Sequence, residues 1–490
     1  MKSTPNIVKL GLLVTLMSCG TTHQDPLGDT TPDAGLTLDL SQPPANPTEW
    51  VEHYVLGVIG PNELCEGLQD FEATPSLIEA AQEPGIHILT GEHVTDTDLV
   101  IESDSTVILL AGTTLRLGDA VTLDIQGRLI ALGKDTTPVV ITSLGTYKAV
   151  ALNGGVSTFH HTSFSHGIDL VTAQDTGKTL LLFEYCSFEH WQDVALRFVG
   201  ADGLLVKNST FGLESENESH GECINGKKSA VEIRHCTFGP MTDYADVMDL
   251  EDCQGSHLPH IIGNTLMGGQ DDGIDLDDCN ALVVGNLIQD FWPPDPANPY
   301  KGVNGGGITG HNSSPVLINN VVLGCFHGIG FKNGARPVLI HNTIIDGNIG
   351  VTLYRTNSSY DDPHGTLLNN IVVGNRAHDS GANQDLVLHG RWWPSYDSSA
   401  GNQASVDLTH NLFGMDYGGI NNQQGQIDFD WVTRLPIPKA GSLADSKGHL
   451  LPVEVPGFGE EDLIEHLTHD YLGANRSKQA PTLGALEVSP

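Results

Sequence analysis

The chain has 490 residues, and its 23 Lys and Arg against 61 Asp and Glu give a formal net charge of −38. Such a charge repels nucleic acid, which we therefore exclude as a partner. An acidic polysaccharide could bind only where a cation bridges the two negative surfaces.

The first residues predict an exported lipoprotein. Lys2 and Lys9 precede a short apolar run, Leu10 to Met17, which is too short to span a bilayer. The segment Leu16-Met17-Ser18-Cys19 resembles the lipobox of bacterial lipoproteins, in which the Cys becomes the lipidated first residue. An ordinary signal peptide that happens to contain a Cys is the alternative. We expect residues 1–19 to be a signal peptide and Cys19 to anchor the protein to the bacterial envelope, at the outer membrane or cell surface.

The remaining organisation is expected to be a single solenoid with flanking segments. Residues 20–50 are rich in Thr, Pro, Asp and Gly and predict a flexible tether. Residues 51–85 should form an N-terminal cap region, 86–430 a solenoid, and 431–490 a less regular C-terminal extension that packs on the solenoid or caps it. The apolar spacing in Glu460 to Leu467 predicts a short helix. We expect a monomer that touches a membrane only through its lipid, because no later segment has the apolar length of a membrane helix.

A short phrase recurs through the body of the chain, mostly at intervals of 22 to 28 residues. This spacing suits one turn of a parallel β-helix, with three short strands and their bends, and parallel crossovers are right-handed. The fold class predicted is therefore all-β, a right-handed parallel β-helix of about ten coils. The Asn, Thr or Cys at the second position of each copy should stack about 4.8 Å apart along the solenoid. The copies are His161-Thr-Ser-Phe164, Tyr185-Cys-Ser-Phe188, Asn208-Ser-Thr-Phe211, His235-Cys-Thr-Phe238, Gly263-Asn-Thr-Leu266, Gly285-Asn-Leu-Ile288, Asn319-Asn-Val-Val322, His341-Asn-Thr-Ile344, Asn369-Asn-Ile-Val372 and His410-Asn-Leu-Phe413.

The region from about Ile86 to Gly425 resembles the pectate-lyase-like superfamily of β-helical proteins. The tail, with Asp470-Tyr-Leu-Gly473, Arg476 and Leu483-Gly-Ala-Leu-Glu487, resembles a C-terminal signature of extracellular bacterial β-helix proteins. Neither resemblance specifies an activity, because β-helices carry lyases, hydrolases, adhesins and passive spacers. Function has to be argued from a site.

Two consecutive coils share an acidic phrase. Asp246-Val-Met-Asp249-Leu-Glu251-Asp252-Cys253 aligns without gaps on Asp272-Gly-Ile-Asp275-Leu-Asp277-Asp278-Cys279, at an offset of 26 residues. Alternate residues of a strand share a face, so Asp249 and Glu251 should stack on Asp275 and Asp277. Stacked like charges are unfavourable, and no Lys or Arg lies between Arg234 and Lys301 to relieve them.

A calcium ion would relieve this repulsion, because Ca²⁺ takes six to eight oxygen ligands. We expect Asp246, Asp249, Asp271, Asp272 and Asp275 to form the cage. A solvated acidic face in an already acidic protein is the alternative.

The segment Asp271-Asp272-Gly-Ile-Asp275 resembles the Asp-Asp-Gly-Ile-Asp segment of calcium-dependent pectate lyases of the ninth polysaccharide lyase family. The resemblance implies that these three aspartates hold calcium, with Asp246 or Asp249 as the fourth ligand. It fails at the catalytic base, which those lyases carry as Lys in a Gly-Phe-Lys phrase one coil later. Here that phrase reads Gly307-Ile-Thr309.

A lysine appears one coil further on, in Gly330-Phe-Lys332, and our alignment places it in one column with Asp277 and His311. The candidate catalytic residues are therefore Lys332, His311 and Arg355, with Tyr354 and His327 nearby and Lys301 in the inserted loop as another candidate base. Each of them could instead be an ordinary surface or packing residue. Trp292 and the pair Trp392-Trp393 could stack on sugars or anchor their own loops.

The function expected is calcium-dependent β-elimination of a uronate-containing polysaccharide at the cell surface. A cation on the substrate carboxylate would stabilise the charge that develops when C5 loses its proton. One alternative is a non-catalytic, calcium-stabilised surface lipoprotein that binds glycans or proteins. Another is a glycoside hydrolase that uses two carboxyl groups of the ladder.

Seven cysteines remain after Cys19. Cys253 and Cys279 fall in one column of adjacent coils, where a disulfide and a stacked pair of thiols are both compatible with the spacing. Most of the others are expected to be small apolar residues of the coil interior.

Overall fold

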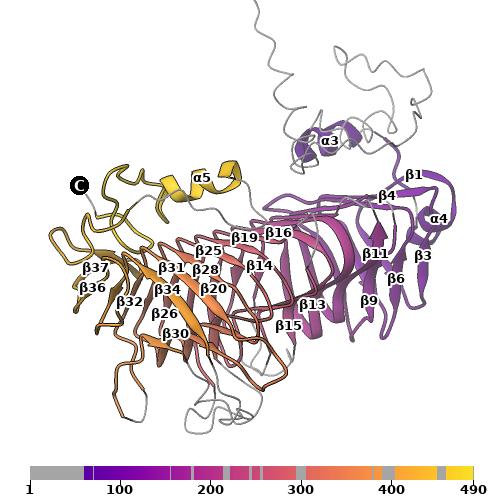
Figure 1. Cartoon of the computed structure of the whole chain (residues 1–490). Helices are drawn as coiled ribbons and strands as arrows, with labels where there is room; N and C mark the ends of the chain where they lie inside the picture. The colour runs from indigo at the N-terminus through magenta and orange to yellow at the C-terminus, as the bar shows by residue number, and fades with distance from the viewer. Residues whose placement is uncertain are drawn as a thin grey trace, which may run out of the picture.

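The computed structural model describes residues 60–488 apart from 70, 75, 155, 178–180, 213–220, 242–244, 254–257, 294–304, 378–379, 389–402 and 450–459. Parallel strands wind into a right-handed solenoid of about 11 turns (Figure 1). The predicted all-β, right-handed parallel β-helix is confirmed. Several sequence-based expectations fall outside the described residues: the signal peptide with Cys19, the tether, Lys301, and Trp392 with Trp393.

Each coil contributes strands to three faces, which we number in chain order. The first face stacks β1 (Gly85–Leu89), β4 (Ser105–Leu110), β7 (Arg128–Leu132), β10 (Ser157–His160), β12 (Leu181–Glu184), the end of β13 (Ser187–Lys207), β16 (Ala230–Arg234), β19 (His260–Ile262), β22 (Leu282–Val284), β25 (Val316–Ile318), β28 (Val338–Ile340), β31 (His364–Leu368) and β34 (Ser405–Thr409).

The second face stacks β2 (Glu92–Thr95), β5 (Thr114–Leu117), β8 (Val139–Ser143), the start of β11 (Thr162–Gly177), the start of β13, β14 (Thr210–Phe211), β17 (Thr237–Phe238), β20 (Thr265–Gly269), β23 (Leu287–Phe291), β26 (Val321–Leu323), β29 (Thr343–Ile345), β32 (Ile371–Val373), β35 (Leu412–Phe413) and β36 (Gln423–Gln424).

The third face stacks β3 (Leu99–Ile101), β6 (Thr122–Ile125), β9 (Ala149–Leu152), the end of β11, the middle of β13, β15 (Glu222–Lys227), β18 (Met248–Glu251), β21 (Ile274–Asp277), β24 (Gly306–His311), β27 (His327–Lys332), β30 (Ile349–Tyr354) and β33 (Leu386–Val387). Because all these pairings are parallel, a residue on one strand lies directly beside its register partner one coil away.

Helices and a hairpin complete the described chain. Helix α4 (Leu77–Gln82) begins after Ser76, whose hydroxyl accepts a hydrogen bond from the Glu79 N–H at 3.2 Å. Its Leu77 is buried against the first coils, so the helix closes that end of the solenoid. Helix α3 (Pro61–Leu68) packs outside the first coils. The predicted C-terminal helix is confirmed as α5 (Glu460–Thr468), and β37 (Phe429–Val432) pairs antiparallel with β38 (Leu435–Pro438). None of the described helices has both the length and the apolar content needed to cross a membrane.

Side chains that point into the coils form one continuous core. The phenylalanines that end successive phrases stack face to face, with ring centroids 5.2 Å apart for Phe164 and Phe188, 4.5 Å for Phe188 and Phe211, and 4.7 Å for Phe211 and Phe238. Stacking of these buried rings from coil to coil stabilises the coil spacing.

A buried asparagine ladder marks the corner between the first and second faces. The side-chain Nδ2 of Asn320 donates to Oδ1 of Asn342 at 2.9 Å, and Nδ2 of Asn342 donates to Oδ1 of Asn370 at 3.0 Å. Each Oδ1 also accepts the backbone N–H of the preceding ladder residue, as from Asn320 to Asn342 at 3.0 Å. The residue before several of these asparagines has a positive φ, for example 57° at Asn319. The predicted stacking of Asn side chains is therefore confirmed.

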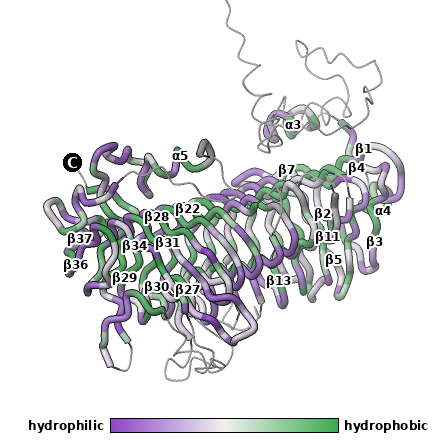
Figure 2. Tube along the Cα trace, in the orientation of Figure 1, coloured by the Kyte–Doolittle hydropathy of each residue, from purple (hydrophilic) through white to green (hydrophobic). Residues whose placement is uncertain are grey.

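The later coils are covered on two of their three faces by the C-terminal extension. On the first face Leu463 of α5 packs on outward apolar residues such as Leu282 and Val316. On the second face Leu483 and Leu486 pack on residues such as Val321. On these two faces the later coils are therefore apolar on the outside as well as the inside, and strands beneath α5 such as β22 and β28 carry hydrophobic residues in Figure 2. Among the described residues, the outward positions on the third face of the same coils are mostly polar, and this is where the acidic phrase lies.

Candidate functional site

The acidic residues occupy adjacent outward columns on the third face. Asp249 pairs in register with Asp275, and Glu251 with Asp277, as the 26-residue offset predicts. The first column continues from Asp275 to Thr309. The second continues from Asp277 through His311, Lys332 and Tyr354. Met248 and Leu250, which alternate with the acids, are buried in the core, so the alternation of the phrase is what points the carboxylates outward.

The five predicted ligands lie close together. Carboxylate oxygens of Asp246, Asp249 and Asp275 lie within 4.8 Å of one another, and so do those of Asp246, Asp271 and Asp272. Asp246 belongs to both triads. The structure therefore brings together every residue of the predicted cage, across two adjacent coils.

Crowding and burial raise the pKa values of these acids. Burial, followed by the charges of Asp272, Asp271 and Asp275, raises the pKa of Asp246 well above its ordinary range. Burial and the charge of Glu222 raise the pKa of Asp249 to about 8. The cluster therefore resists full ionisation by itself, which is the electrostatic situation that a bound divalent cation relieves.

Asp272 is the most constrained member of the cluster. It is 2% exposed, and burial together with the charge of Asp275 raises its pKa to about 6. Its Oδ1 accepts the N–H of Gly306 at 2.9 Å, and the Thr309 hydroxyl lies 2.7 Å from its Oδ2 and 3.0 Å from Oδ1 of Asp275. One hydroxyl carries one proton, so it cannot donate to both carboxylates at once. Thr309, at the position where the resemblance implied a base, thus bridges two proposed ligands.

Lysines from neighbouring coils supply counter-charges that the local sequence lacks. Burial by itself would lower the pKa of Lys332, but the charges of Asp275, Asp277 and Asp272 outweigh burial and raise it. On the other side of the cluster, Lys227 forms an ion pair with Glu251 and lies 3.4 Å from Asp252. The acidic segment itself holds no Lys or Arg, but the coils on either side contribute one each. The predicted column of Asp277, His311 and Lys332 is confirmed.

The other candidate residues are placed less centrally. His311 lies 3.6 Å from Asp278 and contacts the Tyr360 ring edge to face. The Arg355 Nε lies 3.4 Å from Asp362, on the loop after β30. Trp292 donates its Nε1–H to the Gly324 carbonyl and packs on a core phenylalanine, so it anchors the start of its loop to the solenoid.

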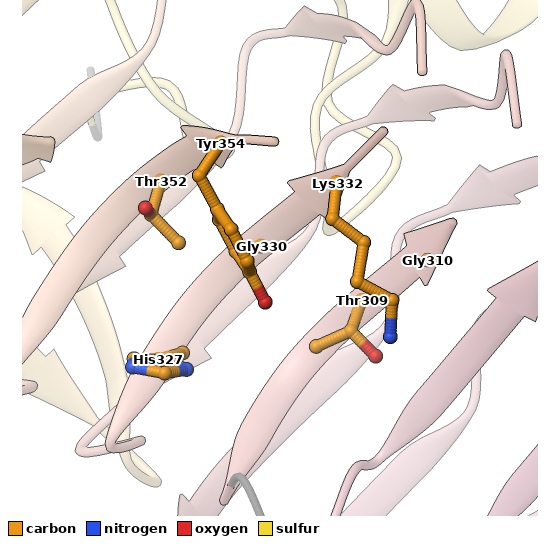
Figure 3. A pocket seen from close by; sticks show the side chains of 7 residues that line it. All are labelled: Thr309, Gly310, His327, Gly330, Lys332, Thr352 and Tyr354. Atoms are coloured by element: carbon orange, nitrogen blue, oxygen red, sulfur yellow. The ribbon is translucent and has the colours of Figure 1, made fainter. Parts of the chain in front are cut away.

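A small cavity lies beside the acidic columns. Its walls come from three consecutive strands, β24, β27 and β30, and it leaves room for about one water molecule. Figure 3 shows the Tyr354 ring lying across Gly330 and the Lys332 chain running toward Thr309, with His327 at the opposite edge. The residues that line it are Thr309, Gly310, His327, Gly330, Lys332, Thr352 and Tyr354.

A disulfide joins the two coils that carry the acids. Cys253 and Cys279, with Cα atoms 4.1 Å apart, follow the acidic strands directly and are bonded to each other. The sequence was compatible with either a disulfide or a stacked pair of thiols, and the structure shows the disulfide. The other cysteines in the described range are buried and unbridged, as expected for small core residues.

A match to a protein family supports the fold, and no comparison names an activity for this chain. A family described as "Right handed beta helix region" matches residues 223–386, the coils that carry the acidic columns and Lys332. The crystal structure of pectate lyase Pel9A is similar over 82% of this chain and 98% of that chain, with 14% sequence identity and a TM-score of 0.34. No curated protein matches the sequence.

Proposed function

Because the chain is a right-handed parallel β-helix with a carboxylate cluster on its third face, we propose that it is a surface carbohydrate-active protein. Its substrate would be a uronate-containing polysaccharide, bound through Ca²⁺ and cleaved by β-elimination. The observation that carries the proposal is the pair of carboxylate triads, each within 4.8 Å, that share Asp246 beside the column of Lys332.

The donor set fits calcium. All five candidate ligands are carboxylates, the hard oxygen donors that Ca²⁺ prefers, and they come from two adjacent coils tied by a disulfide. Bound there, Ca²⁺ would hold the substrate carboxylate and stabilise the charge that develops beside it. The cation would also invert the local charge, which a protein of net charge −38 needs before it can bind a polyanion.

Lys332 is the residue best placed to remove the proton from C5 of the uronate. It is half-buried, it lies one coil from His311 and two from Asp277, and it lines the cavity on the third face. A base has to be uncharged to accept a proton. Two of the carboxylates that raise the pKa of Lys332, Asp275 and Asp272, are groups that a bound cation would neutralise. His311 and Arg355 are alternative bases.

Two observations favour other functions. The carboxylates hold Lys332 in its charged form, which favours a non-catalytic protein in which this lysine is a structural counter-ion. The pKa of about 8 at Asp249 keeps that carboxyl protonated at neutral pH, as the general acid of a glycoside hydrolase requires.

A single assay separates the three functions. Purified protein is incubated with a panel of polyuronates, with and without calcium, and both ultraviolet absorbance and reducing ends are measured. β-Elimination yields an unsaturated product that absorbs, and activity should require calcium and disappear in Lys332→Ala. The matched control is Lys447→Ala, at an exposed lysine. New reducing ends without absorbance would indicate hydrolysis, and glycan binding without cleavage would indicate the non-catalytic protein.

The proposed location is the outer surface of the bacterial envelope, with the lipid on Cys19. In the native host, metabolic labelling with palmitate should mark the parent protein. Cys19→Ser should lose the label and leave the membrane fraction. A labelled Cys19→Ser protein would contradict the proposed anchor.

A further inference from the structure

The small cavity on the third face lies outside the cation cage, since none of the five proposed ligands lines it. It leaves room for about one water molecule, so a sugar ring cannot enter it. A glycan lying along the third face could insert only a single small substituent. The cavity is lined by the strands that follow the acidic columns, and it lies next to the proposed base (Figure 3).

His327 indicates that this substituent is polar. The residue is 9% exposed, and its Nε2 is buried without a hydrogen-bond partner in the part of the chain that the structure describes. A buried polar atom without a partner is unfavourable, and most such atoms in proteins are satisfied by a group or an ordered water. Burial lowers the pKa of His327 to about 4, so the ring is neutral at physiological pH and can donate or accept at Nε2.

Gly330 creates the space. It lies in register between Thr309 and Thr352, and a Cβ at this position would come within 3.3 Å of Cγ2 of Thr352 and 3.8 Å of Cγ2 of Thr309. A methyl group therefore fits only if the Thr352 side chain shifts by a few tenths of an ångström, and it occupies the volume. The walls offer donors, the Lys332 amino group and the Tyr354 hydroxyl, beside the neutral imidazole of His327. A hydroxyl group suits this set, because its oxygen can accept from a donor while its proton goes to Nε2.

We propose that the cavity is a hydroxyl subsite, in which one free ring hydroxyl of the bound uronate hydrogen-bonds to His327 Nε2. This inference rests on the proposed function, since it requires the glycan to lie along the third face. An O-acetyl or O-methyl group is too large for the space, so the subsite selects unsubstituted uronates.

Calorimetric titration of the calcium-loaded protein with a short oligogalacturonate tests the subsite. His327→Phe keeps the ring volume without the nitrogen, and Gly330→Ala fills the space; each should weaken binding about tenfold, the effect of one lost hydrogen bond. His327→Gln, which keeps a polar end, should restore part of the loss. Gly212→Ala is the matched control, since a Cβ there meets nothing within 4 Å. Thermal melts of each variant check that it is folded.

The outcomes separate this inference from the proposed function. If the parent binds and the folded His327→Phe and Gly330→Ala proteins bind equally well, the subsite is wrong and the proposed function stands. If the parent neither binds nor cleaves any polyuronate, the proposed function fails, and the uronate subsite fails with it. A crystal structure gives an independent readout: the free parent should hold a water oxygen within hydrogen-bonding distance of His327 Nε2, and Gly330→Ala should not. An empty cavity in the parent overturns the subsite directly.

Discussion

Asp246 links the two triads of the acidic cluster, and its backbone contact shows how tightly the neighbouring coils are coupled. Its Oδ1 accepts the N–H of Asp272 at 2.9 Å, so the same carboxylate that would hold a cation also fixes the start of the next strand. Removing its charge while keeping its shape therefore separates metal binding from folding.

Asp246→Asn should lose the stabilisation that calcium gives the parent. At a calcium concentration 100-fold above Kd, a single site stabilises the folded state by about 2.7 kcal/mol. Without calcium the variant should melt close to the parent, because the raised pKa of Asp246 already favours its uncharged form. The measurement is the melting temperature with and without calcium.

The matched control for this change is Asp135→Asn, at an exposed aspartate outside the cluster. It should respond to calcium as the parent does. An Asp246→Asn protein with an undiminished calcium shift would place the ion elsewhere or exclude it.

The stability of the metal-free protein should fall as pH rises from about 5 to 8. Asp272 and Asp277 have pKa values raised to about 6, and Asp249 to about 8, whereas all three titrate near 4 when unfolded. The folded state therefore binds more protons over this range, and its advantage is complete below the unfolded pKa and lost as pH passes the folded values.

Melting curves from pH 4.5 to 8.5 in a chelator check this sign. Calcium should flatten the slope, because it replaces the bound protons, and the calcium affinity should rise with pH. A metal-free protein that gains stability between pH 5 and 8 would contradict the raised pKa values.

At the scale of elements, the asparagine ladder and the disulfide hold neighbouring coils in register. Each ladder residue forms hydrogen bonds to the coils on both sides. Nδ2 of Asn342 donates to Oδ1 of Asn370 and to the Leu317 carbonyl, the latter at 2.9 Å. Oδ1 of Asn342 accepts from Nδ2 of Asn320. Hydrogen bonds of this kind are buried, so a lost member leaves unsatisfied groups on both sides.

Asn342→Ala should lower the free energy of unfolding by roughly 3 kcal/mol or more, because it leaves buried polar groups of two neighbours without hydrogen-bond partners. The denaturation midpoint measures this effect. Asn475→Ala, at an exposed side chain in the C-terminal extension, should change the midpoint little. Equal midpoints for the two variants would show that the ladder contributes little to stability.

At the scale of the whole molecule, the C-terminal extension determines which face remains available. It covers outward apolar residues of the first and second faces, and Arg476 holds it in place. The side chain of Arg476 is fully buried and donates to Oδ1 of Asn319 at 2.8 Å, to Glu487 at 3.0 Å and to carbonyls of the extension. If an apolar residue replaces this buried charge, the acceptors lose their hydrogen-bond donor.

Arg476→Met should loosen the extension before the solenoid unfolds. Breaking a buried ion pair from one side costs about 3–5 kcal/mol, and the freed faces expose apolar surface. Hydrogen exchange should rise first in α5 and the tail, with increased binding of a hydrophobic dye. Arg434→Met, at an arginine whose side chain is 68% exposed, is the matched control. Uniform exchange in the Arg476→Met protein would argue against an independently docked extension.

The sequence by itself determined the fold and the register of the site. A β-helix repeats its hydrogen bonds at the spacing of one coil, so the recurring phrase predicted the coils, the asparagine ladder and the stacking of Asp249 on Asp275. The amphipathic spacing near residue 460 likewise predicted α5. These features follow from periodic patterns of residue types, which can be read directly from the sequence.

Only the tertiary structure decided what surrounds the acids. The sequence placed Lys332 in the column of Asp277, but only the structure shows that its charge acts on the acids and that Lys227 pairs with Glu251 from the other side. The bridging role of Thr309 depends on where one hydroxyl lies between two carboxylates, and the cavity at Gly330 depends on side chains from three strands. Burial and the contacts between coils set these properties, because they depend on distances in space rather than on the order of residues.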